Sequence, residues 1–132
     1  VNRALFRSKS RTRLAMEAWM AEWAEYYDND RVVIMQIPLS LCLDYKATEA
    51  DVEELSSLAA LVAGTDCGVT LRELEPGKVK ISLRTGPRVN ATKVCALLGG
   101  GGHAAAAGAT LSGTLSEAKQ AVLQAIDMVV GE

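Results

Sequence analysis

Apolar residues recur at helical spacing in three stretches of the sequence. The first runs from Ser10 to about Tyr27, and the second begins at Thr48 and ends near Gly64. The third begins at Thr114. Both threonines are followed three residues later by an acidic residue, which is typical of a capping box at a helix start. The three patterns predict amphipathic helices, each with one apolar face turned to the core.

The first of these helices is rich in tryptophan. Its apolar face is expected to consist of Met16, Trp19, Met20, Trp23 and Tyr27, with glutamates on the opposite side. The helical period alone explains where the two tryptophans stand, so we interpret them as core residues rather than as a platform for stacking bases. The turn-forming sequence Asp28-Asn29-Asp30 is expected to end the helix.

Three further runs have the pattern of strands. Val32 to Ile37 is a short apolar run between turn residues, which favours a buried strand. The runs Cys67 to Leu74 and Lys78 to Thr85 are joined by Glu-Pro-Gly and predict a hairpin. Apolar residues stand at every second position of the last run. Ser82 and Arg84 should therefore point to the same side, out of the apolar layer.

Shorter elements complete the pattern. Asn90 can cap a helix that continues to Leu98 and ends at Gly99, and residues 109–112 can form a last strand. The segment 39–46 fits neither pattern clearly. Taken together, the elements predict an α/β (α+β) fold, a mixed β-sheet with a central hairpin and helices packed against it.

Composition and charge limit the functions to consider. The chain has 132 residues, 49% of them hydrophobic and 23% charged, which suits one globular domain. Its formal charge of −2 gives no overall attraction to nucleic acid or to an anionic membrane, so any anion site must be local. Basic residues crowd the start, interpreted as a solvated helix start or interdomain linker. A second basic cluster consists of Lys78, Lys80, Arg84, Arg88 and Lys93.

Three cysteines without a Cys-x-x-Cys pair, and a single histidine, favour a reducing compartment. We expect the cysteines to be small buried residues rather than nucleophiles or metal ligands. No run approaches the ~18 apolar residues of a membrane span, and no signal segment opens the chain. These features predict a soluble cytoplasmic protein without a membrane partner. The first residue is Val1, so a fragment of a longer protein is expected.

The stretch from Gly99 to Gly108 is the one that ordinary packing does not predict. Four consecutive glycines each cost roughly 0.5 to 1 kcal/mol relative to alanine in regular structure, so they imply unusual dihedral angles or close backbone approach. A loop without side chains can turn several N–H groups toward one phosphate, and His103 can add a hydrogen bond or a charge. The spacing fits neither the Walker loop nor the dinucleotide fingerprint. On the residues alone, phosphate binding and a packing role are equal alternatives.

The sequence Gly-Gly-Gly-Gly-His-x-x-Ala-Ala-Gly at positions 99–108 resembles the signature of the DHH-associated domain of the DHH phosphoesterases. The hairpin strands 71–74 and 79–85 and the helix start at 47–49 resemble the nanoRNase branch. That branch contains RecJ-like enzymes that degrade very short oligonucleotides and remove the 3′ phosphate from adenosine 3′,5′-bisphosphate. The resemblance implies that residues 28–132 form the DHH-associated domain. Residues 1–27 would be a linker and entering helix from an N-terminal DHH domain.

In this family the DHH-associated domain closes over the substrate and holds its phosphate or nucleotide end. The resemblance assigns the phosphate cradle to Gly100, Gly101, Gly102 and His103, and further substrate contacts to Arg84 with Ser82 or Thr85. The partners that it implies are a short oligonucleotide or phosphorylated nucleotide and the N-terminal DHH domain of the same parent chain. It leaves a homodimer open.

The catalytic metals of the family are expected elsewhere. Its N-terminal DHH domain binds two divalent metal ions, commonly manganese, whereas this sequence has no Asp-His-His triplet and a single histidine. A two-metal site that activates water cannot be assembled from these residues, so the sequence by itself is expected to hydrolyse nothing. Two alternatives stay open: a domain like the C-terminal domain of alanyl-tRNA synthetase, and a nonenzymatic nucleotide-binding or RNA-binding module. The substrate could be an oligoribonucleotide, a bisphosphonucleotide or a cyclic dinucleotide.

Overall fold

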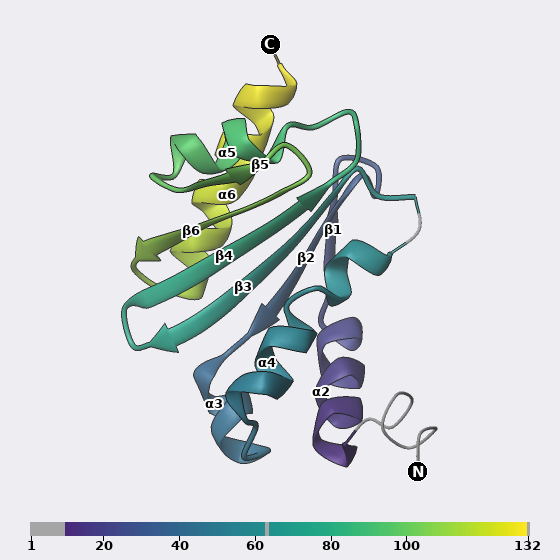
Figure 1. Ribbon diagram of the computed structural model, residues 1–132, viewed down its shortest axis with the longest axis vertical. Helices are drawn as coiled ribbons and strands as arrows, with labels where there is room; N and C mark the ends of the chain where they lie inside the picture. The colour runs from purple at the N-terminus through teal and green to yellow at the C-terminus, as the bar shows by residue number, and fades with distance from the viewer. Residues whose placement is uncertain (1–9, 63, 132) are drawn as a thin grey trace.

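The computed structural model describes residues 10–62 and 64–131, which form a mixed sheet with helices on both faces (Figure 1). The helices are α2 (Arg11–Glu22), α3 (Leu39–Asp44), α4 (Glu49–Leu55), the 3-10 helix η1 (Leu58–Leu61), α5 (Ala91–Leu97) and α6 (Leu115–Val130). The strands are β1 (Glu25–Tyr27), β2 (Val32–Ile37), β3 (Cys67–Glu75), β4 (Lys78–Thr85), β5 (Gly101–His103) and β6 (Ala106–Ser112). Residues 1–9, the start of the expected linker, lie outside the described residues.

The strands lie in the order β1-β2-β3-β4-β6-β5. β2 and β3 are parallel, and the other neighbouring strands are antiparallel. The predicted hairpin of β3 and β4 occupies the centre of the sheet, as Figure 1 shows. The sequence-based fold class is therefore confirmed.

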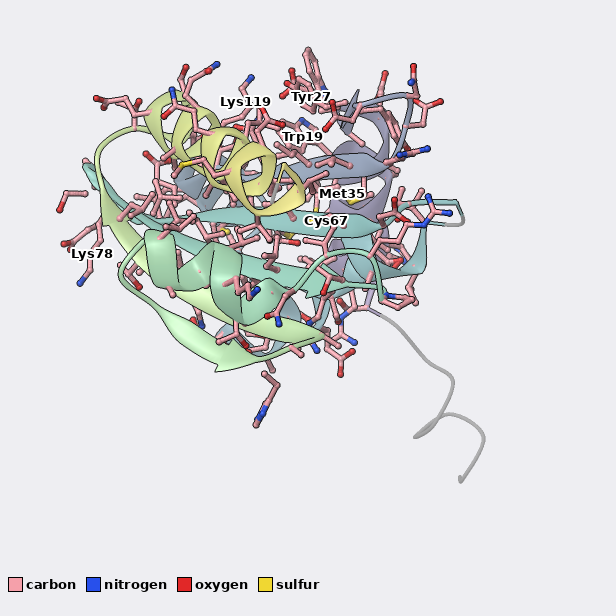
Figure 2. All side chains as sticks on the ribbon, turned by 90° about the horizontal axis from the view of Figure 1, so that it is seen from above. Trp19, Tyr27, Met35, Cys67, Lys78 and Lys119 are labelled. Atoms are coloured by element: carbon pink, nitrogen blue, oxygen red, sulfur yellow. The ribbon has the colours of Figure 1, made fainter. Side chains whose placement is uncertain are left out.

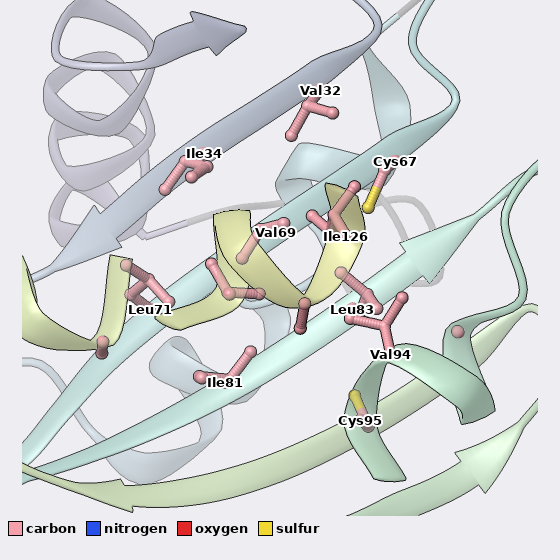
Figure 3. Packing of buried hydrophobic residues seen from close by; sticks show 14 of the residues in the cluster. Val32, Ile34, Cys67, Val69, Leu71, Ile81, Leu83, Val94, Cys95 and Ile126 are labelled. Atoms are coloured by element: carbon pink, nitrogen blue, oxygen red, sulfur yellow. The ribbon is translucent and has the colours of Figure 1, made fainter. Parts of the chain in front are cut away.

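One face of the sheet packs against α5 and α6. Val69, Ile81 and Leu83 project from β3 and β4 onto this face and meet Val94 and Ile126 from the helices (Figure 3). All five side chains are buried. This apolar layer explains why the two helices lie side by side across the middle strands.

The opposite face is covered over only part of its width. Four helical elements cover β2 on this side: α2, α3, α4 and η1. Met16 and Met20 of α2 are buried together with Val33 and Met35 of β2. On β4, by contrast, Lys80 and Ser82 are partly exposed and Arg84 is exposed on this face. We call the side of β4, β6 and β5 that is turned away from α5 and α6 the open face.

The first helix ends earlier than its pattern predicts. α2 stops at Glu22, and Tyr27, expected on the helix, belongs to β1 and pairs with Val32. Asp28, Asn29 and Asp30 have φ between 54° and 65° and form the turn of a β1–β2 hairpin rather than a simple helix end. Short polar side chains tolerate this left-handed conformation better than most.

The expected tryptophan core is only partly present. Met16 and Met20 are fully buried, and Trp19 is partly buried against the same cluster. The side chain of Trp23 is 62% exposed and stacks on Trp19, with ring centroids 5.9 Å apart. Its exposure follows from its position as the C-terminal cap of α2, beyond the last helical turn.

The second predicted helix is broken. α4 ends at Leu55, and the 3-10 helix η1 follows. The hydroxyls of Ser56 and Ser57 donate to the carbonyl oxygens of Val52 and Glu54, at 2.9 and 3.0 Å. Such side-chain bonds compete with the regular helix pattern. The segment that the pattern left ambiguous is α3, whose first N–H, from Leu39, donates to Glu73 at 2.9 Å.

Both predicted capping boxes are present. The hydroxyls of Thr48 and Thr114 accept from the N–H groups of Asp51 and Glu117, whose carboxylates accept in return from the threonine N–H groups. Together they fix the starts of α4 and α6.

The cysteines are core residues. Cys67 and Cys95 are buried, and Cys42 is partly buried. Burial raises the pKa of Cys67 to about 12 and also raises the pKa of the other two thiols. The thiols therefore stay protonated at neutral pH, as expected of small packing residues. In the part of the chain that the structure describes, no helix has the length and apolar character needed to cross a membrane.

Candidate anion-binding site

The glycine run begins as a helix cap. Gly99 has φ 84° and follows α5 directly; its N–H donates to the oxygen of Ala96 at 3.1 Å. The N–H of Gly100 donates to the oxygen of Cys95 at 2.8 Å. These two bonds form the Schellman pattern, which needs a left-handed residue just past the helix. Two of the four glycines thus terminate α5.

Gly100 also lies against β6. A β-carbon on Gly100 would overlap the oxygen of Gly108 and come within 2.7 Å of the β-carbon of Ala109. This position therefore requires glycine for close approach of two backbone segments. The expectation that its N–H cradles phosphate needs correction, because that N–H is already bonded to Cys95.

The rest of the run is a strand rather than the expected loop. Gly101–His103 form β5, at the edge of the sheet, paired with β6. Gly102 has φ 147° and lies against Ala107, whereas a β-carbon on Gly101 would meet open space. On an edge strand, alternate N–H groups point away from the neighbouring strand and are free to bind a ligand.

Strand register brings the expected site residues together. Arg84 pairs with Ala106, and Ala106 pairs with His103. Paired residues of neighbouring strands point to the same face. Arg84 and His103 therefore flank the small side chain of Ala106 on the open face. Strands are ~4.8 Å apart, so their α-carbons are separated by roughly 10 Å.

The next row repeats this arrangement. Ser82 pairs with Gly108, which pairs with Gly101. The two rows leave a floor of small residues between β4 and β5, and a shallow pocket of about 300 Å³ opens there. Its lining consists of Ser82, Arg84, Gly101, Gly102, Ala106, Ala107 and Gly108.

The chemistry of this pocket is that of an anion site. Arg84 is exposed and forms none of the ion pairs observed among residues 10–62 and 64–131. Its guanidinium can fork onto two oxygens of one phosphate, and backbone N–H groups of β5 can add donors from the opposite side. His103 is exposed at the rim and can donate a further hydrogen bond. Within the described residues, no group of three His, Cys, Asp or Glu is placed to hold a metal ion.

Thr85 lies apart from this row. It follows Arg84, so its side chain points to the other side of β4. Its hydroxyl donates to the oxygen of Ala104 at 3.0 Å, and its N–H donates to the oxygen of Ala105 at 2.9 Å. Ala104 also accepts from the N–H of Ala91 at 2.7 Å. Thr85 thereby anchors the β5–β6 turn, which carries His103.

Replacing Thr85 with valine tests this anchoring. We expect a loss of about 0.5–1.5 kcal/mol in the free energy of unfolding, measured by urea denaturation, because one hydrogen bond is lost while the shape is kept. Thr110→Val on β6 is the matched control; its side chain is exposed, and it should change stability by less than about 0.5 kcal/mol. Equal losses in both variants would contradict an anchoring role.

Sequence reasoning missed the floor of the site. Ala106 and Gly108 were noted only as members of the small-residue stretch 99–108, and their alternation on one face of β6 was not predicted. A signal for this floor was present in the sequence. Small residues at every second position of a strand leave one of its faces open to close approach by a ligand. Lys80 was noted as a member of the basic cluster but not as a site residue. It stands two residues before Ser82 and shares its face.

A second pocket, of about 450 Å³, lies at the end of the molecule where the C-terminal part of α6 meets the β1–β2 turn. Its apolar floor includes Val32, Val89 and Ile126. Acidic residues and arginines both line its rim, so it lacks the local excess of positive charge that a phosphate requires.

Known proteins resemble this chain in sequence and in fold. It is 43% identical over 79 residues to the bifunctional oligoribonuclease and PAP phosphatase NrnA of Thermus thermophilus, an alignment that spans 59% of this chain and 24% of that relative. An exopolyphosphatase-related protein from Bacteroides fragilis superposes with a TM-score of 0.84 and 21% identity, covering 98% of this chain and 38% of that structure. The pGpG-specific phosphodiesterase PggH from Vibrio cholerae superposes with a TM-score of 0.63 and 13% identity, covering 92% and 40%.

The two solved structures establish the fold alone at these identities, and this chain spans less than half of each relative. The family follows from a separate finding. The model of the DHHA1 domain matches residues 29–132, most of the chain. This protein therefore belongs to the DHHA1 domain family, the DHH-associated domains of DHH phosphoesterases.

Proposed function

We propose that this chain is the substrate-binding domain of a DHH-family phosphoesterase, and that its open face holds a phosphate of a short oligonucleotide or of adenosine 3′,5′-bisphosphate. The observation that carries this proposal is the shared pocket of Arg84, Gly101 and Gly102. These residues come from two strands separated by β6, and among residues 10–62 and 64–131 no ion pair of Arg84 is observed.

Each group of the pocket has a distinct role in this proposal. Arg84 binds two phosphate oxygens and fixes the orientation of the phosphate. The small residues Ala106 and Gly108 let the sugar-phosphate backbone approach the sheet closely. Ser82, partly exposed, and His103 donate hydrogen bonds from the two sides of the floor.

The hydrolytic step belongs to an N-terminal DHH domain of the parent chain in this proposal. Divalent metal ions, with manganese as the expected species, would activate water there. The functions named for the Thermus relative and for the Vibrio phosphodiesterase, both acting on nucleotide phosphates, support the same class of substrate. Residues of this chain bind and orient the substrate, and the place of action is expected to be the cytoplasm.

Calorimetric titration of the chain tests the proposal. Adenosine 3′,5′-bisphosphate should bind, and adenosine should not, because the site recognises phosphate. Incubation of the same ligand with the chain and manganese should release no inorganic phosphate. Robust turnover that a chelator abolishes would contradict the assignment of hydrolysis to another domain, and equal binding of adenosine would contradict an anion site.

A further inference from the structure

The positive charge of the open face extends beyond the pocket. Alternation along β4 places Lys80 and Lys78 on the same side as Arg84. Lys80 is partly exposed, and Lys78 is exposed and projects outward at the end of the sheet (Figure 2). Arg88 and Lys93, the other members of the basic cluster in the sequence, lie outside β4, in the loop before α5 and on α5 itself. Only Lys78, Lys80 and Arg84 of that cluster therefore form a row along β4.

Lys80 keeps its charge available despite a nearby carboxylate. It pairs in register with Arg72, which binds Glu49 through two hydrogen bonds of 2.8 and 2.6 Å. The hydrogen bond and charge of Arg72 hold the pKa of Glu49 below its usual value, and the charge of Lys80 lowers it further. Glu53 also acts on the charge of Arg72, so Arg72 has carboxylates of its own and does not depend on Lys80 for neutralisation. Lys80 is the partly exposed cation of this group and lies on the side toward Ser82.

The spacing of the row matters for what it can bind. Strands rise ~3.4 Å per residue, so the α-carbons of Arg84 and Lys80 lie roughly 13 Å apart. Because of this separation, the two side chains would bind two different phosphates. A stacked single strand advances ~3.4 Å per phosphate, so this span corresponds to about four nucleotide steps, or fewer in an extended strand.

The charges around Arg84 also favour one direction for a bound oligonucleotide along β4. On the other side of Arg84, a pocket of about 240 Å³ is lined by Arg84 itself, Asp66 and Gly86. Asp66 lies 4.0 Å from Arg88, and its negative charge offsets the positive charge of that side. Toward Lys80, the row gains the charge of Lys80 and the exposed residue Thr110, which pairs with Lys80 on β6. Lys78, further along, pairs in register with Glu75. A polyanion anchored at Arg84 is therefore favoured in the direction of Lys80.

We infer that Lys80 is a length-specificity residue, which binds a second, non-terminal phosphate of a single-stranded oligonucleotide whose first phosphate is held at Arg84. This inference rests on the proposed function. It adds that linear oligonucleotides long enough to span the distance from Arg84 to Lys80 gain affinity from Lys80, whereas mononucleotides do not reach it.

The experiment compares two probes without divalent metal: adenosine 3′,5′-bisphosphate and a five-residue oligoadenylate. Lys80→Ala should weaken binding of the oligoadenylate by about tenfold, the scale of one charged hydrogen bond, and leave the bisphosphate unchanged. The slope of log K against log salt for the oligoadenylate should fall by about 0.7, the value for one phosphate contact on a single strand. Lys80→Arg should restore both quantities. Lys93→Ala, an exposed lysine on α5, is the control.

The possible results distinguish failure of the proposed function from failure of the role of Lys80. If the wild-type chain binds neither probe, the proposed function fails, and the inference fails with it. If both probes bind and Lys80→Ala changes neither affinity, only the role of Lys80 is overturned. A loss that is equal for the two probes would place Lys80 at the same phosphate as Arg84 and would overturn the length dependence. Melting temperatures of the two Lys80 variants should match the wild type, since Lys80 is partly exposed.

Discussion

Replacing Arg84 with alanine is expected to weaken binding of adenosine 3′,5′-bisphosphate by about 1.5–3 kcal/mol, the contribution of a hydrogen bond to a charged group. Arg84 is exposed and its partner strands pack through other residues, so the melting temperature should stay the same. His103→Ala should cause a smaller loss, because His103 lies at the rim and adds one donor. Calorimetric titration of each variant measures these differences.

Two matched variants separate charge from geometry. Arg84→Lys keeps the charge but loses the two-pronged geometry, so its affinity should fall between those of the wild type and the alanine variant. Arg88→Ala removes the same charge four residues away and leaves Asp66 without its ion-pair partner, so it should reduce affinity much less than Arg84→Ala does. Unchanged binding in both Arg84→Ala and His103→Ala would leave the glycine run with a packing function only.

Gly100→Ala is expected to destabilise the fold by about 3 kcal/mol or more, which would lower the melting temperature by on the order of 10 °C. The added methyl group would overlap the backbone oxygen of Gly108, and backbone cannot swing aside as a flexible side chain can. The segment between α5 and β5 would have to separate from β6. Differential scanning calorimetry of the variant measures the effect.

Gly101→Ala is the matched control for that change. A β-carbon at Gly101 meets open space, and the residue needs no left-handed conformation, so the variant should fold with near wild-type stability. Its methyl group would project onto the pocket floor and should reduce phosphate binding. Similar stability of the two variants would mean that the backbone at Gly100 does not approach β6 as closely as the structure places it.

The elements that were predicted from the sequence are those with local signals. The hairpin strands carry their own turn and alternation, and both capping boxes consist of residues three positions apart. β5 could not be predicted in this way, because glycine has low strand propensity and its strand conformation depends on pairing with β6. β1 was missed for a similar reason. Its three residues continue a helical pattern and become a strand only by pairing with β2.

The candidate site was predictable in part. Alternation placed Ser82 and Arg84 on one face, and the helix between Arg84 and the glycines suggested that the chain returns to the same edge. The role of Gly100 was not accessible, because its contact with Gly108 depends on how two strands meet in space. The same alternation places Lys80 on this face, but a single strand does not reveal that the helices leave this part of the face uncovered.

β2 divides its residues between the two sides of the sheet. Val32 and Ile34 pack beneath α6, whereas Val33, Met35 and Ile37 pack beneath α2 and α4. Detaching this one strand would expose apolar surface on both sides at once, so neither layer can melt while the other stays intact. We therefore expect the described residues to unfold as one cooperative unit. The anion pocket lies at the other edge of the sheet, and we expect it to be lost in the same transition, although β2 does not line it.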